Sequence, residues 1–542
     1  GYKQVNDQYF DTLRFVLPDS VSAQQVRTIA LSKEVNLRYF DNGDVGMSID
    51  ETTDVSAANV LLSIFAIAAG KDYPKVDDIP VSNTINKTLK RQSAYLTHEV
   101  FNKYHTETEM MRYIKRLDRK DISLAHSMIS LGSCTMKLNA AAEMLPLSRP
   151  EFMCMHPLVP EDQAEGYREL INNLSEELRV ITGFAGVSLQ PNSGAAGEYT
   201  GLRVIRAYLE NIGQGHRNKV LIPASAHGTN PASAIQAGFT TVTCACDEQG
   251  NVDMADLRAK AEENKDDLAA LMITYPSTHG IFETEIVEIC RIIHDCGAQV
   301  YMDGANMNAQ VGLTNPGVIG ADVCHLNLHK TFSTPHGGGG PGSGPVGCKE
   351  ILKPFIPGVR VEKEEETYHF VKAQDSLGDV KMFYGNFLVV VKALSYILTL
   401  GKEGIPEAAR NAVLNANYMM NKLKDLYPMA YDEICMHEFV MSLADLKKKT
   451  GISAMDIAKG LLDDGIHPPT MYFPLIVDEA LMVEPTETES KETLDDAIAV
   501  FRKLYKRAET DPEKLYQAPV TTPVTRLDEV NAARHPHLRY VF

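Results

Sequence analysis

The segment Ala321-Asp-Val-Cys-His-Leu-Asn-Leu-His-Lys-Thr-Phe332 predicts an α/β sheet with a functional lysine at the end of a strand. Val323, Leu326 and Leu328 are residue types of a buried strand, and parallel strands place functional side chains at their carboxyl ends. Lys330 follows them and precedes a glycine-rich run. A buried lysine is costly unless it is paired or its charge is removed, as in a Schiff base. Taken alone, however, Lys330 is more simply a lysine that extends to solvent.

The sequence on both sides repeats the same strand pattern. From about Leu178, short apolar runs alternate with amphipathic helices, which is typical of a mostly parallel sheet covered on both faces. One helix carries Ile286, Ile289 and Ile293 on one stripe and ends at Gly297, and its length suits a right-handed crossover. The predicted strands are residues 220–222, 271–274, 300–302 and 323–328.

Changes in pattern divide the 542 residues into four predicted regions. Residues 1–85, with helical patterns at 22–33 and 55–69, are expected to form a small α/β unit. A segment rich in Pro, Asp, Asn and Ser (72–90) leads into a helical linker and N-terminal arm at 86–150. The large α/β domain is predicted at 151–355 and a smaller α+β domain at 356–542. In the latter we predict helices at 387–400, 406–426, 454–463 and 490–507 and strands at 438–443 and 481–483.

Composition excludes several classes of protein. The 53 basic against 71 acidic residues give a net charge of -18, which argues against nucleic acid or an anionic membrane as the main partner. Apolar runs at 60–69 and 387–400 are too short, or too interrupted by Lys392, to span a bilayer. The nine cysteines lack CxxC pairs and fit reduced thiols. Because the chain opens on Gly1 without a targeting pattern, we expect a fragment of a longer protein.

Metal binding is not predicted at either place where the sequence suggests it. Asp41-Asn-Gly-Asp-Val-Gly46 partly matches a calcium loop, but Gly43 occupies a ligand position and Thr52 replaces the bidentate glutamate. A hairpin turn is the preferred interpretation. His325 and His329 would share a metal only on a helix, whereas the apolar alternation predicts a strand.

Three further features point to one cofactor when they are combined with Lys330. Pro191-Asn-Ser-Gly-Ala-Ala-Gly-Glu198 precedes an amphipathic helix, whose first backbone N–H groups can bind a phosphate. His227 follows a strand, where an imidazole can stack on a planar ring, and Asp303 ends another strand, where a carboxylate can keep a pyridine nitrogen protonated. Each feature has a simpler explanation by itself: a turn, a structural histidine or a helix N-cap. Together the four predict a pyridoxal phosphate site.

The features above belong to longer sequence motifs. These are Ser133-Cys-Thr-Met-Lys-Leu-Asn139, Gln190-Pro-Asn-Ser-Gly194, Ser225-Ala-His-Gly-Thr-Asn-Pro-Ala232, Thr274-Tyr-Pro-Ser-Thr278, Asp303-Gly-Ala-Asn-Met-Asn-Ala309 and His325-Leu-Asn-Leu-His-Lys-Thr-Phe332. By these motifs, the chain resembles the P-protein family of the glycine cleavage system over nearly its whole length. The resemblance implies the pyridoxal-phosphate-dependent transferase fold (fold type I), with a mostly parallel seven-stranded sheet. It also implies that residues 1–85 are the remnant of a preceding homologous half and that 151–355 form the cofactor-binding domain.

The resemblance assigns roles to individual positions. It makes Lys330 the residue that forms the Schiff base, Asp303 the partner of the pyridine nitrogen and His227 the residue that stacks on the ring. The other predicted cofactor contacts are Ser193, Gly194 and Ala195, which would cradle the phosphate, and Thr278 and Ala305.

Two positions depart from the family's pattern. Ala196 stands where the family commonly has Gln, and Ser376-Leu-Gly-Asp-Val-Lys-Met-Phe-Tyr-Gly-Asn386 is similar to the two-subunit form of the enzyme.

Thr274, Ser277 and His279 are weaker candidates for contact with the cofactor or the substrate. The polar segment at 133–137 is either a loop that closes over the substrate or a surface turn. The glycine run at 336–344 either approaches the cofactor closely or is a flexible connector.

By resemblance, the expected activity is decarboxylation of glycine with transfer of an aminomethyl group to the lipoyl arm of H-protein. The expected partners are glycine, lipoylated H-protein, and the missing N-terminal half or a second copy of the chain. The location would be cytoplasmic in a bacterium, whereas eukaryotic relatives are mitochondrial. Two alternatives stay open: another fold type I enzyme, such as an amino-acid decarboxylase or a cysteine desulfurase, and a non-catalytic scaffold or docking module. A desulfurase needs an exposed reactive thiol, for which no cysteine has an obvious context.

Overall fold

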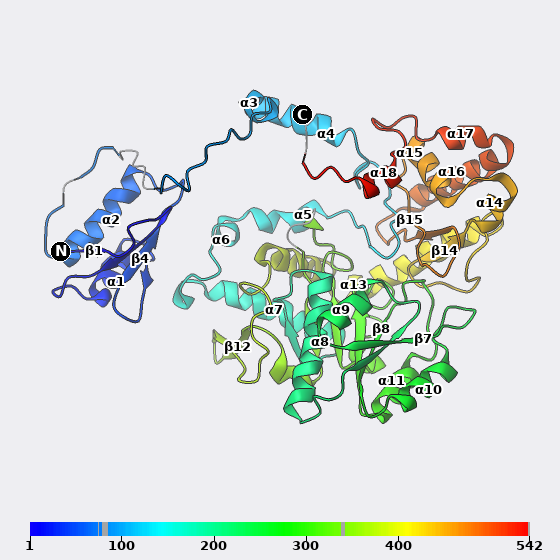
Figure 1. Ribbon diagram of the computed structural model, residues 1–542, viewed down its shortest axis with the longest axis horizontal. Coiled ribbons are helices and arrows are strands. Elements are labelled where there is room, and N and C mark those ends of the chain that lie inside the picture. Colours follow the sequence, from blue (N-terminus) through cyan, green and yellow to red (C-terminus); the bar gives the residue numbers. More distant parts are fainter. Residues whose placement is uncertain (74, 79–84, 338–341, 540–542) are drawn as a thin grey trace. The chain divides into compact units, whose positions relative to one another are not determined.

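The computed structural model describes residues 1–73, 75–78, 85–337 and 342–539, which fall into two units (Figure 1). The first is Gly1–Met110 and the second begins at Met111. Helix α4 (Glu107–Asp118) spans the change from one unit to the other. Parts of the predicted linker (74 and 79–84) and of the glycine run (338–341) lie outside the described residues. In the described part of the chain, no helix has both the length and the hydropathy needed to cross a membrane.

The first unit is a four-stranded antiparallel sheet with helices α1 (Ala23–Ser32) and α2 (Val55–Ala68). A capping box of Ser22 and Gln25 begins α1, and the Asp54 side chain caps α2. The predicted hairpin at 41–46 is confirmed, because it joins two antiparallel strands. A short helix, α3 (Val100–Lys103), lies near the end of this unit. The strands, in sheet order, are β1 (Lys3–Gln4), β2 (Thr12–Val16), β4 (Val45–Ser48) and β3 (Arg38–Tyr39).

The second unit contains a mostly parallel seven-stranded sheet, as predicted. Five neighbouring strands are parallel, and only β11 runs against its neighbours on both sides. Their carboxyl ends therefore meet at one edge of the sheet, where ligands bind in such folds. The strands, in sheet order, are β5 (Gly186–Ser188), β11 (Val346–Cys348), β10 (Val323–Leu326), β9 (Gln299–Gly304), β8 (Leu268–Thr274), β6 (Lys219–Pro223) and β7 (Thr240–Cys244).

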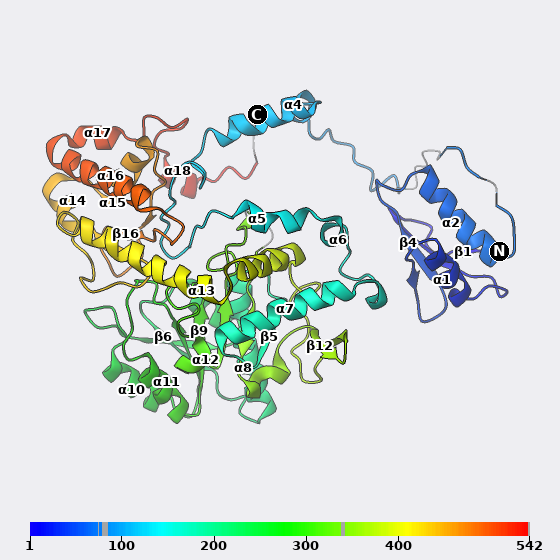
Figure 2. The same ribbon diagram turned by 180° about the vertical axis from the view of Figure 1, so that it is seen from behind.

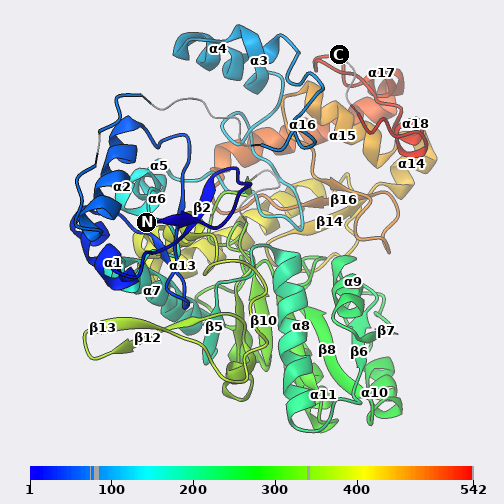
Figure 3. The ribbon, with the colours of Figure 1, turned by 60° about the vertical axis from the view of Figure 1, so that its left-hand side comes forward.

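Helices cover both faces of this sheet, which explains why its strands read as continuous apolar runs. Along β9, Val300 and Met302 face one core cluster, whereas Tyr301 between them faces the other. Helix α8 (Gly194–Asn211) crosses one face beside α9 (Thr229–Gln236) (Figure 3). The opposite face is covered by α7 (Glu165–Thr182), α10 (Met254–Glu263), α11 (Ile286–Asp295) and part of α13 (Phe387–Leu423).

The predicted isoleucine-striped helix is α11. Its C-cap is Cys296, and Gly297 follows with a φ of 74°, a conformation that glycine adopts readily. The Gly297 N–H donates to the His294 carbonyl, which closes the helix end. The prediction that the helix ends at Gly297 is therefore confirmed. The remaining short helices of this part are α5 (Ala141–Met144), α6 (Pro150–Met153) and α12 (Pro316–Ile319).

The C-terminal α+β part, yellow-orange to red in Figure 2, contains a sheet with the strand order β14–β16–β15. The two predicted strands, β14 (Phe439–Ser442) and β16 (Ala480–Val483), pair antiparallel, and β15 (Thr470–Met471) joins β16. Helix α13 packs against both α7 and β14. Its helical geometry is interrupted at Gly401, which lies between the helices predicted at 387–400 and 406–426. The other helices are α14 (Ala444–Thr450), α15 (Ala454–Asp463), α16 (Lys491–Thr510), α17 (Pro512–Gln517) and α18 (Glu529–Arg534).

Two details differ from the prediction. Strand β10 ends at Leu326, and a turn rather than a strand carries Leu328 and Lys330. The charged segment near 362–368 is an antiparallel hairpin of β12 (Arg360–Glu364) and β13 (Thr367–Val371), which its charge pattern does not reveal. Because Lys330 lies on a turn, the direction of its side chain is not set by the alternation of side chains along a strand. The side chain is half-buried beside the carboxyl edge of the sheet.

Candidate active site

A cavity of about 240 Å³ lies at the carboxyl ends of β6, β8, β9 and β10. It brings together all but one of the residues predicted for the cofactor; the exception, Ser193, is the N-cap of the helix that opens onto the cavity. The lining residues are Ser133, Gly194, Ala195, Glu198, His227, Thr229, Thr274, Pro276, Thr278, Asp303, Ala305, Asn306, Asn327, Lys330 and Glu438.

The N-terminus of α8 forms one wall. The Ser193 hydroxyl accepts the Ala196 N–H at 3.1 Å, which fixes the first turn of an 18-residue helix. The first N–H groups of a helix lack intrahelical acceptors and favour an anion. A Cβ atom at Gly194 would lie 2.7 Å from Asn327 Oδ1, so only glycine fits there without displacing Asn327. This wall can hold a phosphate. Ala196 offers no polar side chain there, and its backbone N–H donates to the Ser193 hydroxyl.

Asp303 lies at the end of β9 and is buried. Its carboxylate accepts hydrogen bonds from the Asn230 side chain at 2.9 Å and from the Ala305 N–H at 3.0 Å. Burial alone would raise its pKa, but His325, Asn230 and Ala305 hold the pKa of Asp303 below its ordinary value. Asp303 is therefore a carboxylate at neutral pH. It does not cap a helix, so the simpler explanation considered from the sequence is wrong.

A second layer of side chains supports Asp303 from behind. His325 Nε2 lies 3.5 Å from an Asp303 oxygen, and His325 Nδ1 lies 2.7 Å from the Tyr301 hydroxyl. Burial raises the pKa of Tyr301 well above its ordinary value, so the phenol keeps its proton. We infer that Tyr301 donates to Nδ1, which leaves the Nε2 proton facing Asp303. His325 therefore does not share a site with His329, whose ring lies 5.0 Å from that of His336.

His227 follows β6 on the cavity wall. Its Nδ1 atom accepts the Thr229 N–H at 3.2 Å, and its ring lies 5.5 Å from the Phe473 ring. The Thr229 hydroxyl in turn donates to Glu198 at 2.9 Å. These contacts fix the orientation of an imidazole that borders the same cavity as Lys330 and Asp303.

Lys330 enters the cavity from the turn after β10. Its Nζ atom donates to the Ser133 carbonyl oxygen at 2.8 Å. Ser133 has a φ of 65°, an unusual left-handed conformation for a residue other than glycine, and its N–H donates to Glu438 at 2.6 Å. Thr135 and Lys137 in the same loop are buried, so the surface-turn interpretation of 133–137 is wrong.

The weaker candidates after β8 divide between two places. Thr274 and Thr278 line the cavity, where the Thr274 hydroxyl lies 3.2 Å from the Asn230 side-chain oxygen. His279 instead stacks on Tyr431 at a ring distance of 5.5 Å, and Ser277 lines a different pocket. Thr274 and Thr278 therefore lie where they can contact a ligand in the cavity, whereas the His279 ring packs against Tyr431.

Sequence reasoning missed several polar residues of the cavity. Glu198 lies one helical turn after Gly194, a spacing that predicts the same face of α8. Thr229 lies within the motif at 225–232, and Asn306 lies within the motif at 303–309. Glu438 could not be found in this way, because it precedes β14, more than a hundred residues after Lys330.

Comparisons with known proteins identify relatives of this chain. The family model described as "Glycine cleavage system P-protein" matches residues 73–369, and "Glycine dehydrogenase, C-terminal domain" matches 408–518. The chain is 71% identical over 522 residues to the glycine dehydrogenase (decarboxylating) of Bacteroides fragilis, covering 95% of this chain and 54% of that protein. Its identity to the protein of the same description from Christiangramia forsetii is 50% over 538 residues, covering 98% and 55%. The chain thus spans about half the length of these curated relatives.

Solved structures agree on the fold. A crystal structure of glycine decarboxylase (P-protein) of the glycine cleavage system, in inhibitor-bound form, matches with a TM-score of 0.60 and 16% identity, covering 74% of this chain and 90% of that one. The apo structure of a cysteine desulfurase from Thermococcus onnurineus matches with a TM-score of 0.55 and 16% identity, covering 72% and 97%. At this identity the likeness concerns the fold alone. It is the fold type I architecture predicted from the sequence.

Proposed function

Because the chain belongs to the glycine cleavage system P-protein family, we propose that its cavity binds pyridoxal phosphate and takes part in the decarboxylation of glycine. The observation that carries this proposal is that Lys330, Asp303 and the N-terminus of α8 border one cavity of about 240 Å³. An amine, a buried carboxylate and a set of free N–H groups are the three protein groups that this cofactor requires.

The residues present fit the cofactor. Lys330 would hold it through its amino group, Asp303 would hold the proton on the ring nitrogen, and Ser193, Gly194 and Ala195 would bind the phosphate. When bound, pyridoxal phosphate supplies an electron sink for the electron pair that decarboxylation leaves on carbon. His227 would border the ring, and Thr278 and Ala305 would contact the cofactor's edge. When Lys330 is free, its Nζ atom can give or take a proton within the cavity.

Glycine is the proposed substrate, since the curated relatives are described as glycine dehydrogenase (decarboxylating). Lipoylated H-protein is the proposed acceptor of the aminomethyl group. Because those relatives are about twice as long, we propose that full turnover requires either the remaining part of such a protein or a second copy of this chain. The relatives are bacterial, and a cytoplasmic location is part of the same proposal.

The contacts of one thiol argue against the desulfurase alternative. Cys134 lies in the loop that contacts Lys330, and burial raises the pKa of its thiol above the ordinary value. A desulfurase requires a thiolate as the nucleophile. Cys134 is therefore poorly suited to that role, although the fold is shared with such an enzyme.

The test is spectroscopic and isotopic. The chain is mixed with pyridoxal phosphate, and the visible band of the lysine-bound cofactor is recorded for the wild type, Lys330→Ala and the control Lys448→Ala, an exposed lysine on α14. We expect the band in the wild type and the control only. Exchange of labelled bicarbonate into glycine, with and without lipoylated H-protein, then tests the reaction. A band that persists in Lys330→Ala would contradict the proposed site.

A further inference from the structure

A short series of hydrogen bonds connects the C-terminal α+β part to Lys330. The Lys330 amino group donates to the Ser133 carbonyl at 2.8 Å, and the Ser133 N–H donates to Glu438 Oε2 at 2.6 Å. Both polar backbone groups of one residue are thus engaged, one by the lysine and one by the glutamate. The relative orientation of these two groups depends on the φ of Ser133, which is 65°.

That conformation is unfavourable for serine and persists only where its surroundings hold it. On its N-terminal side, the Gly132 carbonyl accepts the Thr470 hydroxyl at 2.7 Å, and the Gly132 N–H lies 3.3 Å from the Met482 carbonyl. A Cβ atom at Gly132 would lie 2.2 Å from the Met482 side chain, so this close approach requires glycine. Strands β15 and β16 therefore fix the backbone that enters Ser133.

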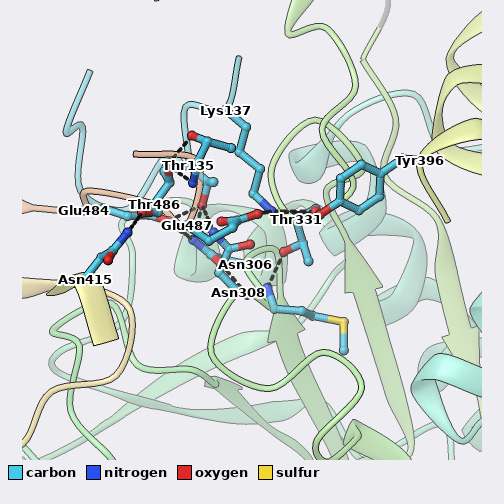
Figure 4. Close-up of polar contacts among 12 residues, drawn as sticks. Thr135, Lys137, Asn306, Asn308, Thr331, Tyr396, Asn415, Glu484, Thr486 and Glu487 are labelled. Atoms are coloured by element: carbon cyan, nitrogen blue, oxygen red, sulfur yellow. Dashed lines mark hydrogen bonds and ion pairs between the residues drawn. The ribbon is translucent and has the colours of Figure 1, made fainter. Parts of the chain in front are cut away.

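On its C-terminal side, the loop is fixed by the buried contacts drawn in Figure 4. The Thr135 hydroxyl donates to Glu484, which also accepts from the Asn308 amide at 3.2 Å. Lys137 forms an ion pair with Glu487 at 2.6 Å. Both ends of the loop are therefore anchored, and Ser133 between them depends on Glu438 for its N–H acceptor.

Glu438 itself is held in a buried charge cluster. Its Oε1 atom lies 3.4 Å from His437 Nε2, and the side chains of Glu438, His437 and Glu484 are almost fully buried. Burial alone would lower the pKa of His437, but Glu438 and Glu484 raise it above its ordinary value. A buried carboxylate is tolerated when it is paired in this way. Glu438 also borders the cavity that contains Lys330.

We propose that Glu438 is a positioning residue that, through Ser133, presents a carbonyl oxygen to the amino group of Lys330 whenever that group is free. This inference rests on the proposed function, in which Lys330 would hold the cofactor and its amino group is free at other times. A free amine in this cavity requires a hydrogen-bond acceptor, and the Ser133 carbonyl supplies it. Without a side-chain oxygen at position 438 to accept its N–H, Ser133 can return to an ordinary φ, and its carbonyl then turns away from Nζ.

The first comparison removes or keeps the acceptor for the Ser133 N–H. Glu438→Ala removes it, whereas Glu438→Gln keeps a side-chain oxygen. The second comparison changes the backbone preference and leaves Glu438 in place. Ser133→Val disfavours a positive φ, whereas Ser133→Gly adopts it freely. We expect Glu438→Ala and Ser133→Val to share one defect that Glu438→Gln and Ser133→Gly lack or show weakly. If one alanine or valine variant fails to fold, the other pair still decides the question.

The readout is the reactivity of the Lys330 amine in the cofactor-free chain, measured by competitive acetylation and peptide mass spectrometry. The hydrogen bond to the Ser133 carbonyl restrains the amine, so its loss should raise the rate of acetylation. We expect about a tenfold gain in acetylation rate at neutral pH, within the range for loss of one hydrogen bond to a charged group. Both variants at 438 lose the carboxylate that raises the pKa of His437, so they differ from each other only in the acceptor for the Ser133 N–H. The side chains of Asp303, Cys134, His329 and His336 are kept in all four variants.

Equal rates of Lys330 acetylation in all four variants and the wild type would overturn the inference. The visible band with pyridoxal phosphate is recorded separately for the wild type. Its absence would contradict the proposed function and leave the acetylation result decisive for the role of Glu438, so the two failures are distinguishable.

Discussion

Lys137 and Glu487 form a buried ion pair in which Nζ lies 2.6 Å from a carboxylate oxygen and the side chains are 2% and 11% exposed. Lys137 also donates to the carbonyl of Thr331, the residue after Lys330, at 2.8 Å. Burial alone would lower the pKa of Lys137, but Glu487 and Tyr396 raise it, so the lysine is charged. The pair thus connects the loop at 133–137, the turn that carries Lys330 and the segment after β16.

Breaking this pair should destabilise the second unit. Lys137→Met leaves Glu487 buried without its partner, which typically costs about 3–5 kcal/mol. The same change at Lys447, whose side chain is half exposed in its ion pair with Glu479, should cost clearly less, because exposed pairs are screened by solvent. Thermal unfolding of the two variants checks this difference, and the double variant Lys137→Met with Glu487→Gln should recover part of the loss. Equal effects at 137 and 447 would show that the buried pair is not a stabilising contact.

Removing the charge of Asp303 should impair the chemistry more than it impairs the fold. Asp303→Asn keeps the size of the side chain and loses the carboxylate that would hold the proton on the cofactor's ring nitrogen. We expect exchange of labelled bicarbonate into glycine to fall on the order of a hundredfold or more, while the thermal midpoint changes little. Exchange at the wild-type rate would remove Asp303 from the proposed mechanism.

Gly194→Ala tests the phosphate wall. Its Cβ atom would lie 2.7 Å from Asn327 Oδ1, so either the first turn of α8 or Asn327 must move. Such overpacking typically costs about 1–3 kcal/mol, and we expect the Kd for pyridoxal phosphate to rise by about tenfold or more. Gly166→Ala on α7, where a Cβ atom meets nothing within 4 Å, is the matched control. A titration that gives the same Kd for both variants would argue against this wall as the phosphate site.

His279 should contribute to the loss of stability in acid. Burial lowers its pKa from 6.5 to about 4, so the native state favours the neutral ring. Its contribution to stability is complete above the ordinary value and is lost as the pH falls from 6.5 towards 4. His279→Phe keeps a ring against Tyr431 and cannot be protonated. We expect the thermal midpoint of the variant to fall less over this interval, and parallel curves would disprove the assignment.

The sequence predicts the sheet, the crossover helix α11 and the grouping of Lys330, Asp303 and His227, because each depends on local periodicity or on a residue at a strand end. Prediction of strand ends is less reliable where a turn intervenes, as at Lys330, since strand β10 stops four residues earlier. Division of the second unit at residue 355 stays a prediction.

The support around Lys330 could not be predicted, because it comes from residues that are distant in sequence. Ser133 contacts Lys330 across 197 positions and Glu438 across 305. Nothing in the local pattern of 133–137 distinguishes a buried loop from a surface turn, since Thr135 and Lys137 are polar residue types. Their burial depends on Glu484 and Glu487, which only the tertiary structure brings to them.

The most direct test of the proposed site is to locate the residue to which the cofactor becomes covalently attached. The chain is incubated with pyridoxal phosphate, reduced with borohydride and mapped by peptide mass spectrometry. We expect the reduced cofactor on Lys330, at near-stoichiometric yield in the wild type and at none in Lys330→Ala. Attachment at Lys137 or spread over surface lysines, with Lys330 unmodified, would contradict it.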